Sequence, residues 1–181
     1  MMQAGRFQKV SFEQFYQAMA DSVSKEDKDY AMSAEFVSYV HELYDQLELP
    51  TRATSGSAGY DFKAPFGFEL APGDTIKIPT GIRAKIDEGW WLGCLPRSGL
   101  GFKYRIQLDN TLGVIDSDYY CSDNEGHIFI KLTNDSKDGK SAHVRAGNGF
   151  AQAIFIPYGI TYDDRATAVR NGGMGSTDAV K

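Results

Sequence analysis

The spacing of hydrophobic and polar positions changes near Pro50, which divides the chain into two parts. Before Pro50, apolar residues recur at helical spacing in two runs, one from Phe12 and one after Ser33. Ser11 predicts the N-cap of the first run, because a glutamine follows it at capping-box spacing. Residues 7–10 predict a short strand ahead of that helix, and Pro50 is expected to stop the second helix.

After Thr51 the pattern alternates, with short apolar–polar runs separated by glycine, proline and aspartate. Many short strands at such spacing predict an all-β sandwich or barrel. We therefore expect an all-β fold with a short N-terminal helical insertion. The expected divisions are a strand and helical extension packed on the core (1–50), the β core (51–165), and a flexible C-terminal phosphate-lid arm (166–181).

Composition narrows the functional classes. A chain of 181 residues with a net charge of −5 argues against a duplex nucleic-acid binder but is compatible with a small anionic ligand. Cys94 and Cys121 form neither a disulfide framework nor a metal-ligand pattern. No signal peptide and no membrane-length apolar stretch is evident, so we expect a reduced, cytoplasmic protein with no nucleic acid and no membrane as partner.

Three polar segments could carry chemistry, although each alone has a simpler explanation. Asp116 follows the apolar run 113–115, where a carboxylate could activate a water, but two aspartates in a turn are the commoner interpretation. The segment 96–103 combines an arginine, a hydroxyl and glycines, as a phosphate site or a basic surface turn would. The segment 170–177 could be a phosphate lid or a frayed glycine-rich terminus.

Taken together and in order, five segments resemble the five motifs of the homotrimeric dUTPase family, of bacterial or phage type. The resemblance implies a distorted jelly-roll (β-clip) fold, three subunits that share active sites, and hydrolysis of dUTP to dUMP and pyrophosphate. That activity would limit uracil in DNA and supply dUMP for dTMP synthesis. The segments span 57–62, 96–103, 110–119, 149–154 and 170–177.

The resemblance also implies roles for single residues. Asp116 would activate the water that attacks the α-phosphorus. Mg²⁺ would be held mainly by phosphates and waters, with Asp61 and Gln152 gripping those waters and no direct protein ligand. Gln152 is also expected to line the substrate site, and the phosphate chain would contact Arg97, Ser98 and Gly99.

The base, the sugar and the end of the triphosphate are assigned in the same way. Uracil would be read by Asn110 and by backbone groups in the hairpin that includes Gly113 and Ile115, while Tyr119 would pack against the deoxyribose and exclude a 2′-hydroxyl. The residues expected to close over the bound nucleotide are Arg170, Met174, Gly175, Ser176 and Thr177.

Three features depart from the family pattern. Met174 stands where a phenylalanine usually stacks on uracil, so we expect weaker lid closure. Residues 120–125 form an insertion, which we expect to lengthen a surface loop. The helical region 11–48 could cover the exterior or a sheet edge, or bind a regulatory protein if the gene is phage-encoded.

Two other functions remain as alternatives. A dCTP deaminase shares the fold but carries a catalytic glutamate on the strand after the third motif, where Lys131 stands here. A non-catalytic binding module would be expected to lose the water-activating carboxylate or the lid arginine, and both Asp116 and Arg170 are present.

Overall fold

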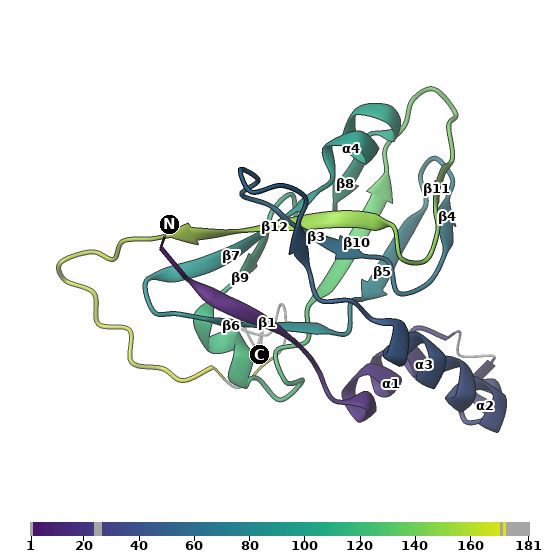
Figure 1. Cartoon of the computed structure of the whole chain (residues 1–181), viewed down its shortest axis with the longest axis horizontal. Helices are drawn as coiled ribbons and strands as arrows, with labels where there is room; N and C mark the ends of the chain where they lie inside the picture. The colour runs from purple at the N-terminus through teal and green to yellow at the C-terminus, as the bar shows by residue number, and fades with distance from the viewer. Residues whose placement is uncertain (1, 24–26, 171, 173–181) are drawn as a thin grey trace, which may run out of the picture.

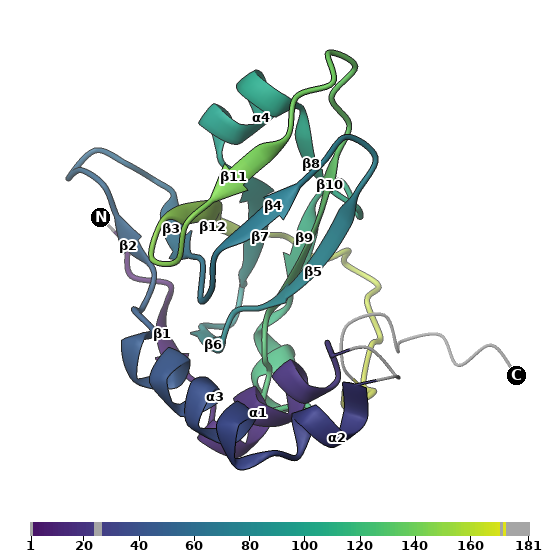
Figure 2. The ribbon, with the colours of Figure 1, turned by 90° about the vertical axis from the view of Figure 1, so that its right-hand side faces the viewer.

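The computed structural model of the protein describes residues 2–23, 27–170 and 172. Antiparallel strands enclose one hydrophobic core, and three N-terminal helices lie together below it (Figures 1 and 2). The largest sheet has five strands and carries Asp61, Gly113, Ile115 and Gln152. Its order is β2 (Thr51–Arg52), β3 (Tyr60–Lys63), β12 (Gly149–Pro157), β7 (Trp90–Pro96) and β9 (Gly113–Ile115).

Three smaller antiparallel sheets complete the enclosure. One joins β5 (Thr75–Pro79), β10 (Phe129–Asn134) and β8 (Ile106–Leu108). Another joins β4 (Phe68–Leu70) to β11 (Ala142–Val144), and the third pairs β1 (Gly5–Lys9) with β6 (Ile82–Ile86). Because β1 pairs with β6, the N-terminal extension is joined to the core by backbone hydrogen bonds.

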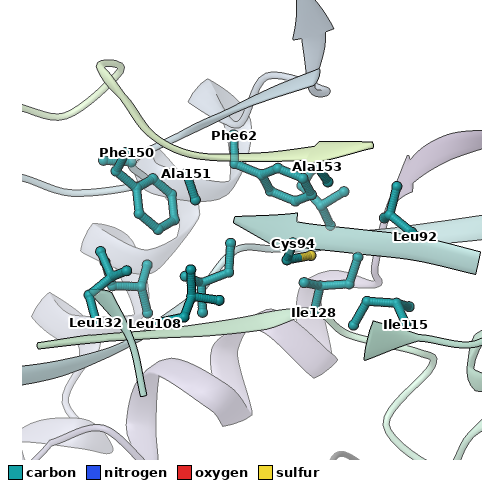
Figure 3. Packing of buried hydrophobic residues seen from close by; sticks show 14 of the residues in the cluster. Phe62, Leu92, Cys94, Leu108, Ile115, Ile128, Leu132, Phe150, Ala151 and Ala153 are labelled. Atoms are coloured by element: carbon teal, nitrogen blue, oxygen red, sulfur yellow. The ribbon is translucent and has the colours of Figure 1, made fainter. Parts of the chain in front are cut away.

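Alternation along the strands builds the core, as the pattern after Thr51 predicts. In β6, Ile82, Ala84 and Ile86 are buried while Lys85 is exposed. Buried side chains from opposite sheets meet in the interior, where Phe62 and Phe150 face Leu108 and Leu132 (Figure 3). The predicted all-β fold with an N-terminal helical part is confirmed.

The helices form a second, smaller hydrophobic cluster. In α1 (Phe12–Ala20), Ser11 Oγ accepts the Gln14 N–H at 3.1 Å, and Ser33 caps α3 (Ala34–Gln46) in the same manner. A short helix, α2 (Lys28–Ala31), lies between α1 and α3 in the chain. Phe15, Phe36 and Val40 are buried in this cluster, and each helix stays in place because its apolar face is covered there.

Two further segments position the candidate site. A helix that the pattern did not predict, α4 (Ser98–Tyr104), follows β7 directly, and a 3₁₀ helix (Ser117–Cys121) follows β9. After β12, residues 158–170 have no regular strand or helix and loop back towards that 3₁₀ helix (yellow in Figure 1). None of the helices in the described part of the chain is both long and apolar enough to span a membrane.

Candidate active site

One group of candidate residues gathers where β3, β7 and β12 lie side by side. Gln152 is the register partner of Asp61, and Arg97 Nη2 lies 3.3 Å from Asp61 Oδ2. Arg97 also donates to Gly149 O at 3.5 Å, and a side chain on Gly149 would place Cβ 2.5 Å from Arg97 Nη1. Gly149 therefore leaves the room that the guanidinium occupies, a role that sequence reasoning missed although this glycine opens the fourth motif.

The same group contains the residues expected to hold phosphate. Ser98 and Gly99 form the first turn of α4 and are exposed beside Arg97. The Gln152 amide nitrogen donates to Pro96 O at 3.2 Å, which leaves its Oε1 turned towards Gly59. Exposed donors beside a half-buried arginine are suited to an anion, because each can form a charge-assisted hydrogen bond.

The oxygens of Asp61 and Gln152 in this group suit a magnesium ion that is held mainly by other ligands. Hard cations prefer oxygen, and Mg²⁺ usually keeps several waters besides one or two carboxylates and substrate phosphates. Asp61 supplies a carboxylate that is largely buried and Gln152 an amide oxygen, whereas no cluster of three metal-ligating side chains occurs among the described residues. The arrangement suits an ion brought by a triphosphate better than a resident metal.

A second group surrounds Asp116, which directly follows β9. Arg170 Nη2 pairs with Asp116 Oδ2, and Arg170 Nε donates to Asp118 Oδ1 at 2.9 Å. The guanidinium also lies 5.8 Å from the centre of the Tyr119 ring. Arg170 thus contacts Asp116, the candidate general base, and lies near the Tyr119 ring that is expected to face the sugar. The sequence did not predict these contacts.

A cavity of about 470 Å³ lies along β9, and Asn110, Gly113 and Ile115 all line it. This volume falls within the usual range for small-molecule sites. Ile115 is 2% exposed, so its side chain packs in the core and it can offer a ligand mainly its backbone groups. The three predicted base-reading residues are therefore brought together.

Cys94 and Lys131 line the same cavity, and their surroundings limit what each can do. Burial raises the pKa of the Cys94 thiol to about 12, so it stays protonated and is a poor nucleophile. Lys131 Nζ lies 2.6 Å from Asp109 Oδ2, and hydrogen bonds from Lys131 and Thr133 lower the pKa of Asp109. A paired ammonium, rather than a carboxylic acid, therefore occupies the position that the deaminase alternative would need.

The two groups lie towards opposite ends of β7. Leu92 pairs with Ile115, which places Asp116 opposite Trp91, whereas Arg97 lies six residues further along the chain. At about 3.3 Å per residue, roughly 20 Å separate these positions within one chain. Met174, Gly175, Ser176 and Thr177 lie outside the described residues, so the rest of the predicted lid is not placed.

Comparisons with known proteins identify the family to which the chain belongs. Residues 45–178 match the family model described as dUTPase. Deoxyuridine 5′-triphosphate nucleotidohydrolase of Escherichia coli O9:H4 (strain HS) is 42% identical over 138 residues, which cover 72% of this chain and 87% of that protein.

Solved structures show the same fold. The dUTPase from Streptococcus mutans matches with a TM-score of 0.56 and 36% identity, covering 62% of this chain and 88% of that chain. A mutant dUTPase from phage phi11 of S. aureus, described with a structural Mg(II) ion, matches with a TM-score of 0.53 over 67% of this chain and 90% of that one. Its 21% identity bears on the fold alone. The chain therefore belongs to the dUTPase family, as its five motifs predict.

Proposed function

We propose that the protein hydrolyses dUTP to dUMP and pyrophosphate. The observation that carries this proposal is the short strand β9, whose Gly113 and Ile115 line the 470 Å³ cavity and which ends directly on Asp116. A nucleobase held in that cavity would therefore bring the attached sugar and α-phosphate towards the Asp116 carboxylate. Positioning of this kind is what in-line attack by water requires.

In the proposed reaction Asp116 accepts a proton from a water whose oxygen attacks the α-phosphorus. The bond between the α-phosphorus and the bridging oxygen then breaks, and pyrophosphate leaves with the electron pair. Asp116 can act only after Arg170 releases it, because the arginine pairs with that carboxylate in the free chain. We infer that Arg170 moves to the γ-phosphate when the nucleotide binds.

The phosphate chain would be held by the group around Arg97. Arg97, Ser98 and Gly99 supply a guanidinium, a hydroxyl and a backbone N–H, while Asp61 and Gln152 would orient waters on a Mg²⁺ ion carried by the substrate. The ion would supply charge neutralisation on the triphosphate. Support for its placement is the pairing of Asp61 with Gln152 across β3 and β12.

Selectivity would come from the cavity and from Tyr119. Backbone groups at Gly113 and Ile115 would read uracil together with the Asn110 side chain, and cytosine would be rejected because its 4-amino group reverses the hydrogen-bond pattern. Tyr119 would pack against the deoxyribose and leave no room for a 2′-hydroxyl.

We also infer that each site is completed by other copies of the chain, in a homotrimer. The backbone positions of Asp116 and Arg97 lie roughly 20 Å apart along β7, which favours a site in which the two groups come from different copies. A subunit arrangement that brings the Arg97 group of one copy to Asp116 of another would form such a site. The two free thiols favour a reduced, cytoplasmic setting, and a regulatory protein partner stays a prediction.

The test is release of pyrophosphate from dUTP, dCTP, dTTP and UTP in parallel with Mg²⁺, with ammonia measured in each reaction. The proposal expects release from dUTP alone, without ammonia. Ammonia from dCTP would favour a deaminase, and no product from any of the four would favour a binding module.

A further inference from the structure

The insertion 120–125 is a packed bridge rather than the surface loop that the sequence led us to expect. It begins inside the 3₁₀ helix, and its Ser122 is buried. Both of its ends, Tyr120 and Glu125, contact the N-terminal extension, whereas Asn124 between them contacts Tyr119. The insertion therefore connects the helices to a residue of the candidate site.

The phenol of Tyr119 is held on two sides. Its hydroxyl donates to His127 O at 2.7 Å and accepts from Asn124 Nδ2 at 2.8 Å. The ring is only 2% exposed, so these two bonds fix a group that water does not reach freely. They set the depth and the tilt of the ring.

Asn124 is itself fixed by the turn that follows it. Its Oδ1 accepts the Gly126 N–H at 3.2 Å, and its carbonyl accepts the His127 N–H at 3.0 Å. Gly126 has φ of 70°, and a Cβ there would lie 2.7 Å from Tyr119 O. The turn consequently depends on glycine and leaves the Asn124 amide little freedom.

Glu125 ties this turn to α1. Its carboxylate accepts the Ser11 N–H at 2.8 Å and the Ser11 hydroxyl at 2.6 Å. Partial burial alone would raise the pKa of Glu125, but the Ser11 hydrogen bonds and the nearby Arg83 charge outweigh it, so that the pKa is lowered. Tyr120 adds a second link, since its hydroxyl donates to Gln8 Oε1 at 2.6 Å.

We propose that Asn124 is a positioning residue that sets how tightly Tyr119 reads the sugar, and that the N-terminal extension supports it through Glu125. The inference rests on the proposed packing of Tyr119 against deoxyribose. Asn124 also lines both the 470 Å³ cavity and a neighbouring cavity of about 620 Å³ beside α1, so it stands between the base site and the extension.

The test compares kcat/KM for dUTP and UTP in Asn124→Ala. We expect the preference for dUTP to fall about tenfold, the effect of one lost buried hydrogen bond, mainly through a higher kcat/KM for UTP with kcat for dUTP nearly unchanged. Asp123→Ala is the matched control, because Asp123 is an exposed neighbour in the same insertion. Its preference should equal that of the unaltered protein.

Two further variants separate this role from simple support of the turn. Asn124→Asp keeps the acceptor for Gly126 but loses the donor to Tyr119, so its preference should fall as in Asn124→Ala. Tyr119→Phe combined with Asn124→Ala should lose no more than Tyr119→Phe alone, because the phenylalanine already removes the bond that Asn124 makes to the phenol. Full preference in Asn124→Asp, or additive losses in the double variant, would overturn the proposal.

The proposed function fails in a different way. If the unaltered protein does not prefer dUTP over UTP, or if Tyr119→Ala leaves that preference intact, the role of Tyr119 is wrong. If the preference depends on Tyr119 but not on Asn124, the positioning inference alone is wrong.

Discussion

The β core and the N-terminal extension are organised on different principles. In the core, candidate chemical groups stand on or directly after strands, where backbone pairing places Asp61 beside Gln152 and Asp116 follows β9. In the extension, a separate hydrophobic cluster holds the helices, and Phe66 packs against both clusters. The dUTPase family model begins at residue 45, so the core carries the family chemistry and the helices are an addition to it.

Because the two parts are held together separately, the site in the core can depend on the extension only through the contacts between them. The β1–β6 pairing attaches the extension generally, whereas the insertion connects it to Tyr119 specifically. Changes in the core should therefore abolish turnover, and changes at the junction should alter stability and selectivity with turnover largely kept.

The largest effect is expected at Asp116, in the core. Asp116→Asn should lower kcat by about 10²–10⁴-fold, the usual contribution of a general base, while the melting temperature and dUTP binding stay close to normal. Asp118→Asn, the matched change in the neighbouring carboxylate that Arg170 also contacts, should lose much less. Near-normal turnover by Asp116→Asn would remove this residue from the mechanism.

The next effect concerns the arm after β12. Arg170→Ala should lower kcat by about 10²–10³-fold, because a preorganised donor to the phosphates is lost. Arg170→Lys should recover part of the rate, since it keeps the charge but not the two-pronged guanidinium. Deleting residues 170–181 should be at least as damaging, and a fully active deletion would show that the arm is no lid.

At the junction, the expected effect is on folding. Glu125→Ala removes both acceptors of Ser11 and should cost about 2 kcal/mol in the free energy of unfolding, with kcat for dUTP largely kept. Glu88→Ala, at an exposed glutamate in a turn of the core, serves as control. Equal stability of the two variants in denaturant titration would mean that the extension does not depend on this link.

The last effect is a pH dependence. Burial lowers the pKa of His127 from 6.5 to about 3, so as the pH falls below 6.5 the unfolded chain gains a proton that the folded chain does not. Stability present above pH 6.5 should therefore be lost on acidification, by at most about 1.4 kcal/mol per pH unit. His127→Gln keeps an acceptor for the Gly81 N–H and should flatten this slope between pH 6.5 and 4.5, in denaturant titrations. An unchanged slope would assign it to other groups.

Local patterns predicted much of the molecule because the forces involved are local. Helical spacing predicted the two longer N-terminal helices, the first with its cap at Ser11, and alternation predicted the β core. Asn110, Gly113 and Ile115 line one cavity, and their role in reading the base stays a prediction.

The remainder depends on contacts between distant positions, which carry no periodic signal. Glu125 meets Ser11 across a separation of 114 residues, and Arg170 meets Asp116 across 54. Extra residues near a hairpin predict a longer surface loop, whereas in the structure specific hydrogen bonds hold the insertion 120–125 against the extension. Helix α4 was missed because its two glycines are weak helix formers.

In the proposed trimer, Asp116 of one chain works with the Arg97 group of another. The most direct measurement mixes Asp116→Asn and Arg97→Ala subunits after reversible dissociation and assays dUTP hydrolysis. Each variant alone should be nearly inactive. Random reassembly should restore on the order of a quarter of normal activity, because about one site in four then combines an intact Asp116 with an intact Arg97 from a different chain. Activity in the mixed trimers no higher than in the separate variants would contradict the account and place both groups of each site in a single chain.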